Sequence, residues 1–187
     1  MPGAGAVHLI RMRVEYVARV DSRATINLRP ATAEDRFRIR RWLAEPEVGA
    51  GWGNAGSAEA EINLAMGSEA AICRIVECEG AAIGYAHALE IGLLGDERPA
   101  DLAAGTWHVN LLIASQPHRG RGLEGAALTL LTEEVFATTL AVGCAGAVSI
   151  RNEAGVRAYE QAGFRWQRIA YDRLLGPSWL MRKERPL

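Results

Sequence analysis

Hydrophobic and polar positions along the chain follow two periods, one typical of strands and one typical of helices. The apolar runs Ala71–Cys78 and Ala81–Glu90 are separated by only two residues, which predicts a β-hairpin. The segment 106–114, with the sequence TWHVNLLIA, is the clearest further strand. Shorter apolar segments predict strands over residues 26–28, 145–150, 164–171 and 178–181.

Apolar residues at helical spacing predict four helices between these strands. The first begins at the N-cap Thr32 and ends at Leu43. A weaker helix is expected over residues 57–66. The other two begin after the glycine-rich segment 116–122 and at the N-cap Asn152.

The order of these elements predicts one mixed α/β domain of the α+β type. Strands and helices follow each other as βααβββαβαββ, and several neighbouring strands are joined by connections short enough for antiparallel pairing. We therefore expect a mostly antiparallel sheet of roughly six to seven strands flanked by about four helices, built from residues 26–187. Residues 1–25 show no clean period and are treated as an N-terminal extension of uncertain structure.

Composition limits the class of protein. The chain has 187 residues, of which 49% are hydrophobic, enough for one sizeable core without disulfide or metal support. Its apolar runs are too short to span a membrane, and Arg11 interrupts the apolar start, so neither a membrane partner nor a signal peptide is expected. The three cysteines form no CxxC pair, which favours a reducing, cytoplasmic location, and no metal-ligand spacing is recognised.

Charge is distributed unevenly along a chain whose net charge is only −1. Residues 1–43 carry 9 Arg and 4 acidic residues, residues 44–105 carry 2 Arg and 11 acidic residues, and residues 106–187 carry 10 basic and 7 acidic residues. A nucleic-acid-binding face would require the arginines of the first block to converge, and this interpretation is not favoured. The acidic middle block gives the chain a strong local negative charge, and from composition alone its acids are typical of a solvated surface.

The sequence RGRG at residues 119–122 lies between a predicted strand and a predicted helix. Glycines at a helix N-terminus leave backbone N–H groups accessible, and such groups bind anions such as a pyrophosphate. The stretch continues as GRGLEG and also matches the GxGxxG pattern of dinucleotide-binding folds. That alternative is not favoured, because too few residues follow for a doubly wound sheet and the next predicted strand ends without the acidic residue that holds a ribose.

Two motifs in this order resemble those of the GNAT acetyltransferase superfamily. The stretch RGRGLE at residues 119–124 is similar to the form R/Q-x-x-G-x-G/A, and NEAGVRAYEQAGF at residues 152–164 is similar to N-x-x-A-x-x-x-Y-x-x-x-G-F. The resemblance covers roughly residues 26–183. Details such as RPAT at residues 29–32 and IGYA at residues 83–86 are most similar to the branch of aminoglycoside 6′-N-acetyltransferases and of hydroxylysine acetylases of siderophore synthesis.

The resemblance implies an acetyl-CoA site. Backbone groups at Ile113 and Ala114 would pair with the pantetheine amides like a neighbouring strand, and the backbone from Arg119 to Glu124 would cradle the pyrophosphate. The cofactor-binding residues implied in this way are Ile113, Ala114, Arg119, Gly120, Arg121, Gly122, Leu123, Glu124, Asn152 and Tyr159.

Asn152 and Tyr159 carry the side-chain roles that the resemblance implies. Asn152 would hydrogen-bond the pantetheine arm, and Tyr159 would lie near the sulfur and protonate the departing thiolate as general acid. From the residues alone, Asn152 is equally a helix N-cap and Tyr159 equally a core aromatic.

Two residues depart from the family pattern. Glu124 stands at a loop position that is Gly or Ala in the motif, and its carboxylate would lie near the phosphates. Asn110 stands where the aminoglycoside branch has an aspartate thought to deprotonate the amine, and an amide is not a base. His108 lies on the same strand face as Asn110, and His87 and Glu90 lie on the neighbouring strand. Any of these three is a candidate base acting through water, and the alternative for His108 is a structural histidine of the strand.

The resemblance therefore implies an N-acetyltransferase in which a primary amine attacks acetyl-CoA directly, with oxyanion help from a backbone N–H of the fourth core strand. In the resemblance, the segment before the fourth core strand supplies much of the acceptor site, so the acidic block implies a cationic, aminoglycoside-like small molecule. The candidate liners of that site are Trp52, Glu90, Asp96, Glu97 and Asp101. The alternative is that these acids lie on an outer, solvated loop and do not contact the substrate. Alternative acceptors are a protein N-terminus and a siderophore precursor, and a non-catalytic acyl-CoA-binding protein is the alternative from another class. A monomer or a homodimer is expected.

Overall fold

Eight strands form one sheet in the computed structural model, which describes residues 16–20, 24–49, 55–97, 102–172 and 175–186. Their order in the sheet is β1-β2-β3-β4-β5-β6-β8-β7. Every described pair of neighbours is antiparallel except β5 and β6, which are parallel. The strands are β1 (Tyr16–Val20), β2 (Ala24–Pro30), β3 (Ala71–Cys78), β4 (Ala81–Glu90), β5 (Thr106–Ile113), β6 (Gly143–Ser149), β7 (Arg165–Asp172) and β8 (Gly176–Glu184).

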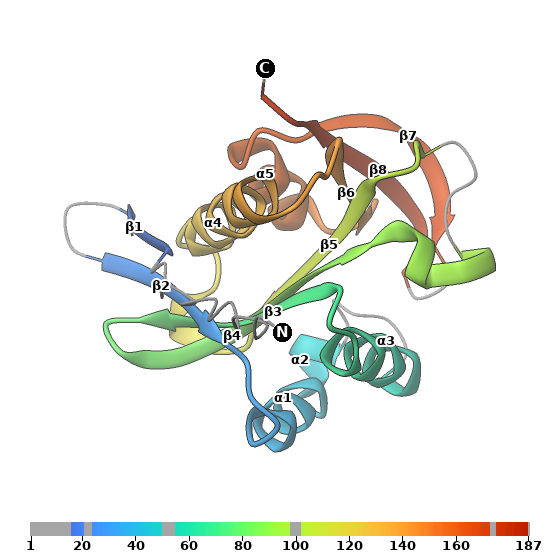
Figure 1. Cartoon of the computed structure of the whole chain (residues 1–187). Coiled ribbons are helices and arrows are strands. Elements are labelled where there is room, and N and C mark those ends of the chain that lie inside the picture. The colour runs from blue at the N-terminus through green and yellow to red at the C-terminus, as the bar shows by residue number, and fades with distance from the viewer. Residues whose placement is uncertain (1–15, 21–23, 50–54, 98–101, 173–174, 187) are drawn as a thin grey trace, which may run out of the picture.

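Helices cover both faces of this sheet, with α4 and α5 on one face and α1, α2 and α3 on the other (Figure 1). The α-helices are α1 (Asp35–Leu43), α2 (Pro46–Gly49), α3 (Ala55–Gly67), α4 (Leu123–Thr138) and α5 (Glu153–Gln161). Two 3₁₀ helices, η1 (Ile91–Glu97) and η2 (Gln116–His118), flank β5 along the chain.

The predicted fold class is confirmed: the chain forms a mixed α/β structure with a mostly antiparallel sheet. One strand more than expected is present, because β1 falls within residues 1–25 and pairs with β2, as in Tyr16↔Leu28. The dinucleotide-binding alternative is wrong, since that fold needs a mostly parallel sheet and the described strands contain a single parallel pair.

The first helix begins later than predicted. The carboxylate of Asp35 accepts hydrogen bonds from the backbone N–H of Thr32 (3.0 Å) and from the guanidinium of Arg29 (2.7 and 2.8 Å). Residues 32–34 therefore form a turn ahead of α1, and the Thr32 side chain does not cap the helix. The Arg29 guanidinium holds the pKa of Asp35 well below its usual range against the opposing effect of burial.

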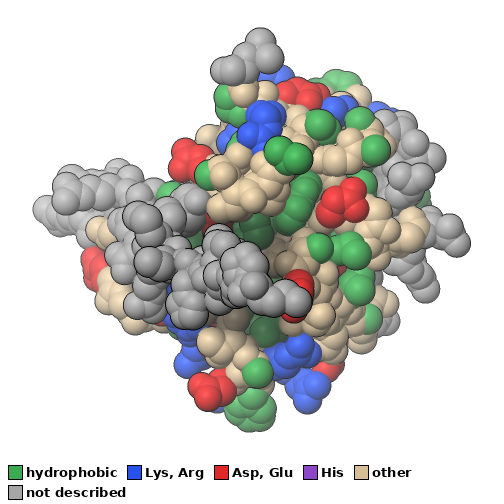
Figure 2. Space-filling model, viewed as in Figure 1, with side chains coloured by type: hydrophobic (Ala, Val, Ile, Leu, Met, Phe, Trp, Pro, Cys, Tyr) green, Lys and Arg blue, Asp and Glu red, His purple; other side chains and the backbone are tan. Residues whose placement is uncertain are grey.

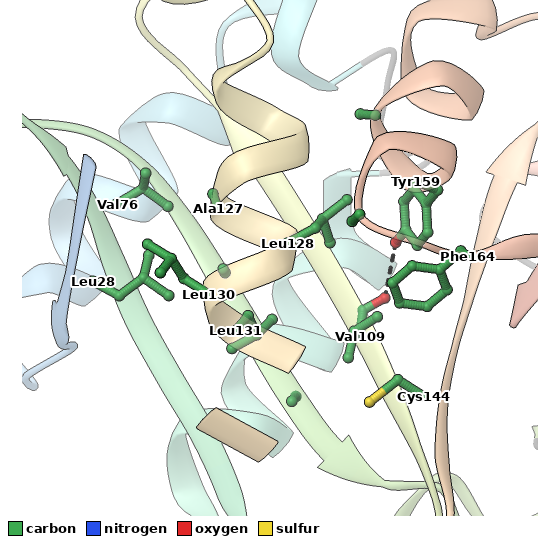
Figure 3. Close-up of a cluster of buried hydrophobic side chains, with 14 of the residues drawn as sticks. Leu28, Val76, Val109, Ala127, Leu128, Leu130, Leu131, Cys144, Tyr159 and Phe164 are labelled. Carbon is green, nitrogen blue, oxygen red and sulfur yellow. Dashed lines mark hydrogen bonds between the residues drawn. The ribbon is translucent and has the colours of Figure 1, made fainter. Parts of the chain in front are cut away.

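Adjacent residues of the central strands are buried on opposite faces of the sheet. In β3, Val76 packs in the cluster under α4, whereas Ile75 packs in the cluster under α1 and α3. Side chains alternate along a strand, so a strand covered by helices on both sides buries apolar residues on both of its faces. Figure 3 shows the cluster under α4, in which Leu128 and Leu131 lie between the helix and the sheet.

On the face shown in Figure 2, Lys and Arg side chains of the described residues are interspersed with Asp and Glu rather than gathered in one basic surface. No helix of the described residues combines the length and the hydrophobicity that a membrane span requires.

Candidate active site

The parallel strands β5 and β6 separate partway along their length, and a cavity of about 370 Å³ lies beside the point where they part. Their described pairing covers three residue pairs, from Thr106↔Gly143 to His108↔Ala145. Beyond it, the cavity is lined by the later residues of both strands, by Leu128 of α4 on one face of the sheet and by Glu61 of α3 on the other. Because groups from both faces line it, two ligands can meet there from opposite sides of the sheet.

A glycine-rich loop presents the N-terminus of α4 to this cavity. Gly122 is the N-cap residue, and both Gly120 (φ +69°) and Gly122 (φ +77°) have left-handed backbone conformations, which favour glycine. A Cβ atom added to Gly120 would meet only open space, so the loop backbone is accessible. Since glycine has no side chain with which to cap the helix, the first N–H groups of α4 remain available to an anion. This geometry fits the diphosphate of coenzyme A.

Arg119 connects this loop to the end of β5. Its guanidinium donates to the carbonyl oxygens of Ile113 (3.0 Å) and Ala114 (2.5 Å) and forms an ion pair with Glu47 (2.8 Å). The Ala114 N–H already donates to the Ile83 carbonyl at 2.8 Å. The backbone groups that the resemblance assigns to the pantetheine arm thus have partners within the protein, and their role in binding that arm stays a prediction.

The last glycine of the GRGLEG stretch serves the packing of two helices. A Cβ atom on Gly125 would lie 2.7 Å from Oε1 of Gln161 and 3.2 Å from the Ala158 carbonyl oxygen. Gly125 therefore allows α4 and α5 to approach each other beside the cavity.

Glu124 places its own carboxylate against the loop. Its Oε1 accepts the Gly120 N–H at 3.2 Å, so one of the donors expected to hold a diphosphate already binds an internal anion. The carboxylate is partly exposed and would face the phosphates as a like charge.

We expect Glu124→Gln to tighten binding of coenzyme A by roughly five-fold, the equivalent of ~1 kcal/mol for removal of one exposed like charge. Calorimetry in 0.05 M and 0.5 M salt measures this, and the gain should shrink at the higher salt. The matched control is Glu133→Gln, an exposed carboxylate further along the same helix. Equal affinities of the Glu124 variant and the parent would show that the carboxylate does not oppose the cofactor.

Tyr159 and Asn152 of the second motif have clear structural roles. Tyr159 is buried on α5, and its hydroxyl donates to the Val109 carbonyl at 3.0 Å (Figure 3). Burial raises the pKa of Tyr159, so the hydroxyl keeps its proton at physiological pH. Asn152 caps α5 by accepting the Gly155 N–H at 2.9 Å. Both residues also line the cavity, so cap and core roles coexist with the predicted ligand contacts.

Glu61 of α3 binds three side chains of the neighbouring strands through one oxygen. Its Oε1 lies 3.0 Å from Nε2 of His87, 3.3 Å from Nε2 of His108 and 3.2 Å from Nδ2 of Asn110. The Asn110 amide is oriented by its Oδ1, which accepts the Leu111 N–H at 2.9 Å. Asn110, predicted to occupy the position of a base, therefore acts as a donor to a carboxylate.

Burial and hydrogen bonding act in opposite directions on this cluster. Burial alone would raise the pKa of Glu61, but the hydrogen bonds from His108 and His87 outweigh it and hold that pKa far below its usual range. Burial alone would lower the pKa of His108, but the hydrogen bond and the charge of Glu61 raise it above its ordinary value. Glu61 is thus an anion throughout the physiological range, and His108 is a stronger base than a free imidazole.

The predicted acceptor residues either lie outside the described lining of the cavity or are not described. Glu90 is not among the residues that line the cavity, and its carboxylate accepts the Gly92 N–H at 2.9 Å. Trp52 and Asp101 lie outside the described residues, as do the side chains of Asp96 and Glu97. The acids of the cavity that the sequence did not single out are Glu47, Glu61 and Asp172.

Gly146 is a further residue that sequence reasoning missed. An added Cβ atom would lie 2.5 Å from both Cε1 and the hydroxyl oxygen of Tyr159. Only glycine at this point of β6 leaves room for the ring beside Val109. A glycine inside a strand is a signal for such a close approach, and it could have been read from the sequence.

The fold and the glycine-rich loop beside the parting strands are those expected of an acyltransferase, and the comparisons with known proteins agree. The model of the acetyltransferase (GNAT) domain matches residues 31–170. The chain therefore belongs to the GNAT acetyltransferase family, whose members are acetyl-CoA-dependent N-acetyltransferases. The search of the curated proteins found no match.

Solved structures share this fold at low sequence identity. The aminoglycoside acetyltransferase AAC(6′)-Ib in complex with coenzyme A and kanamycin is 23% identical, with a TM-score of 0.74, covering 86% of this chain and 95% of the other. An uncharacterized protein from Bacillus halodurans is 14% identical at the same TM-score, with coverages of 91% and 90%. RimJ of Mycobacterium smegmatis, in complex with CoA-disulfide, is 15% identical with a TM-score of 0.65, covering 86% and 82%.

Proposed function

We propose that this protein transfers the acetyl group of acetyl-CoA to a primary amine of a cationic, aminoglycoside-like small molecule. The observation that carries the acceptor class is the charge of the cavity. Among the described residues, four carboxylates line it, against two guanidinium groups. They are Glu47, Glu61, Glu124 and Asp172, against Arg119 and Arg157.

The carboxylates divide between two parts of the cavity. Glu124 belongs to the loop at α4, and Glu47 is paired with Arg119 beside that loop. Glu61 and Asp172 instead lie near His108, whose pKa both of them raise. An acceptor ammonium entering on this side would meet two negative charges, which favours a cationic molecule over a neutral or anionic one.

The cofactor side of the proposal is supported by the accessible loop backbone at the N-terminus of α4. Likeness in fold to AAC(6′)-Ib, which has been solved with acetyl-CoA, supports the same ligand. Acetyl-CoA supplies the activated acetyl thioester. The protein would hold it through the backbone of residues 119–124 and through Asn152, orient the amine beside Glu61 and Asp172, and donate the Tyr159 proton to the leaving sulfur.

A screen of amines with acetyl-CoA, measured by thiol release, tests the proposed function. Polyamines and aminoglycosides should be acetylated with a higher kcat/KM than neutral or anionic amines. Binding of coenzyme A without thiol release from any amine would contradict an enzyme and identify a non-catalytic acyl-CoA-binding protein.

For the best amine we expect KM to rise with salt, because screening over ~10 Å at 0.1 M weakens the attraction of the carboxylates. Asp172→Asn should raise KM at low salt by roughly five-fold, the equivalent of ~1 kcal/mol. Steady-state kinetics at two salt concentrations measures both effects, and Glu133→Gln is the control for a loss of charge outside the cavity. Values of KM that respond neither to salt nor to Asp172→Asn would contradict a cationic acceptor site.

A further inference from the structure

Glu61 and His108 meet at the cavity from elements that are far apart in the sequence. His108 is carried by the central strand β5, and Glu61 by α3. Their side chains are each 15% exposed, whereas His87, which binds the same carboxylate oxygen, is 0% exposed. His108 and Glu61 line the cavity, and His87 is not among its lining residues.

The contact with Glu61 determines which nitrogen of His108 can take up a proton. An ionised carboxylate only accepts hydrogen bonds, so Nε2 of His108 carries the hydrogen that points to Glu61. The lone pair of the neutral ring is then on Nδ1. A carboxylate that binds one nitrogen of an imidazole fixes the tautomer and orientation of the ring and stabilises the imidazolium.

Glu61 is itself held in place and is a poor proton acceptor. Its Oε1 is fixed by His87 on β4 and by Asn110 on β5, and the Asn110 amide is oriented in turn by the Leu111 N–H. The donors that fix the carboxylate also stabilise its charge, so it does not take the proton of an ammonium. His108 is the base of this cluster that reaches the cavity.

We propose that His108 and Glu61 form a catalytic dyad, in which His108 takes a proton from the acceptor ammonium and Glu61 is the positioning residue that orients and strengthens it. This proposal rests on the proposed acetyl transfer to an amine. In the dyad, Glu61 acts on the reaction only through His108. The dyad also accounts for the amide of Asn110, whose Nδ2 lies 3.2 Å from Glu61 Oε1, because a carboxylate at that position would repel Glu61.

The proton balance of the reaction places one proton on the dyad. The ammonium gives a proton to Nδ1 of His108, and the neutral amine nitrogen forms the new C–N bond while the thioester C–S bond breaks. The sulfur leaves with the electron pair and takes the proton of the Tyr159 hydroxyl. The nitrogen loses its second proton to restore that hydroxyl, and His108 releases its proton to solvent, so that the net products are the amide, the thiol and one proton.

Several charged and titratable groups surround His108. Glu61 faces it from α3, His87 from β4, and the charge of Asp172 acts on it from the end of β7. Tyr159 of α5 lines the same cavity and stays protonated. Of these groups, Glu61 has the largest effect in raising the pKa of His108.

Glu61→Gln separates the charge of the carboxylate from its hydrogen bonds. The amide oxygen of glutamine can still accept from His87, His108 and Asn110, so the variant should fold like the parent. Without the negative charge, burial becomes the dominant influence and the pKa of His108 falls. Glu59→Gln is the matched control, since Glu59 lies on the same helix but pairs with Arg40 at the surface.

The first measurement needs no substrate. A side-chain ¹H–¹⁵N NMR titration of the free protein follows the four histidines, and the signal of His108 is assigned from its loss in His108→Gln. The titration should show a lower pKa of His108 in Glu61→Gln than in the parent and no change in Glu59→Gln. An unchanged pKa in Glu61→Gln would refute the dyad, whatever the activity.

The second measurement is the pH profile of kcat/KM for the best amine. The parent should lose activity as pH falls through the pKa of His108, because the protonated ring cannot accept a proton. In Glu61→Gln this limb should move to lower pH, and in His108→Gln kcat should fall by about 100-fold and the limb should disappear. His87→Gln should keep the limb.

The two proposals fail in different ways. A parent that releases no thiol with any amine contradicts the proposed function. A parent that is active, but whose acidic limb stays in place in Glu61→Gln, contradicts the dyad alone and leaves acetyl transfer standing.

Discussion

Replacement of Tyr159 by Phe is expected to lower kcat by about 100-fold or more, while the dissociation constant of coenzyme A changes by less than roughly two-fold. A general acid acts in the transition state, where the departing sulfur gains negative charge, and contributes little to binding in the ground state. The buried hydroxyl keeps its proton because burial raises its pKa, and it lies at the cavity where the strands part.

Initial rates of thiol release measure kcat, and calorimetry measures the affinity for coenzyme A. The aromatic ring of the variant should keep its edge-on contact with Phe164, whose centroid lies 4.9 Å away. Loss of the hydrogen bond to the Val109 carbonyl should cost about 1 kcal/mol of stability. A kcat equal to that of the parent would limit Tyr159 to packing.

The hairpin and the glycine loop could be predicted from sequence because their signals are local. The bounds of β3 and β4 follow from two apolar runs and the two-residue turn between them, where Glu79 and Gly80 both have positive φ. The RGRG loop and the helix after it could be predicted because glycines at a helix N-terminus leave backbone N–H groups accessible to an anion. The start of α1 was misplaced because residues 32–34 form a turn, which is held by the Asp35 carboxylate through the Thr32 N–H and through an ion pair with Arg29 of β2.

Glu61 could not be identified in this way, because its role depends on contacts between distant segments. Its helix has a weak hydrophobic pattern, and Glu61 is one of 11 acidic residues between positions 44 and 105. The signal that exists is the pair His87 and His108, which the register of β4 and β5 places on one face of the sheet. Which helix covers that face, and which of its carboxylates reaches the imidazoles, is decided by tertiary packing.

The acidic block was expected to line the acceptor site, but only some of its described residues reach the cavity. Of the block's described side chains, Glu47 and Glu61 line the cavity, and Asp172, from the block with a net positive charge, joins them. The charge of the block therefore agrees in sign with the excess of carboxylates among the described lining residues of the cavity, but which acids reach the cavity is decided by the positions of α2, α3 and the end of β7.

Gly146→Ala is expected to reduce both stability and turnover through a single contact. The added methyl group would lie 2.5 Å from the Tyr159 hydroxyl and 2.5 Å from its Cε1 atom, so the ring must move away from Val109. Overpacking of this kind costs about 1–3 kcal/mol, which corresponds to a fall in Tm of roughly 3–10 °C for a domain of this size. Because the hydroxyl moves with the ring, kcat should fall toward that of Tyr159→Phe.

Thermal unfolding and thiol release measure the two effects, and Gly67→Ala is the matched control, because an added Cβ atom there meets nothing within 4 Å. The double variant Gly146→Ala/Tyr159→Phe adds a sharper test. If both substitutions remove the same hydroxyl from the reacting sulfur, their effects on kcat will not add, and the double variant will be about as slow as Tyr159→Phe alone. A Gly146→Ala protein that loses stability but keeps the kcat of the parent would contradict the expectation that this contact couples turnover to stability through Tyr159.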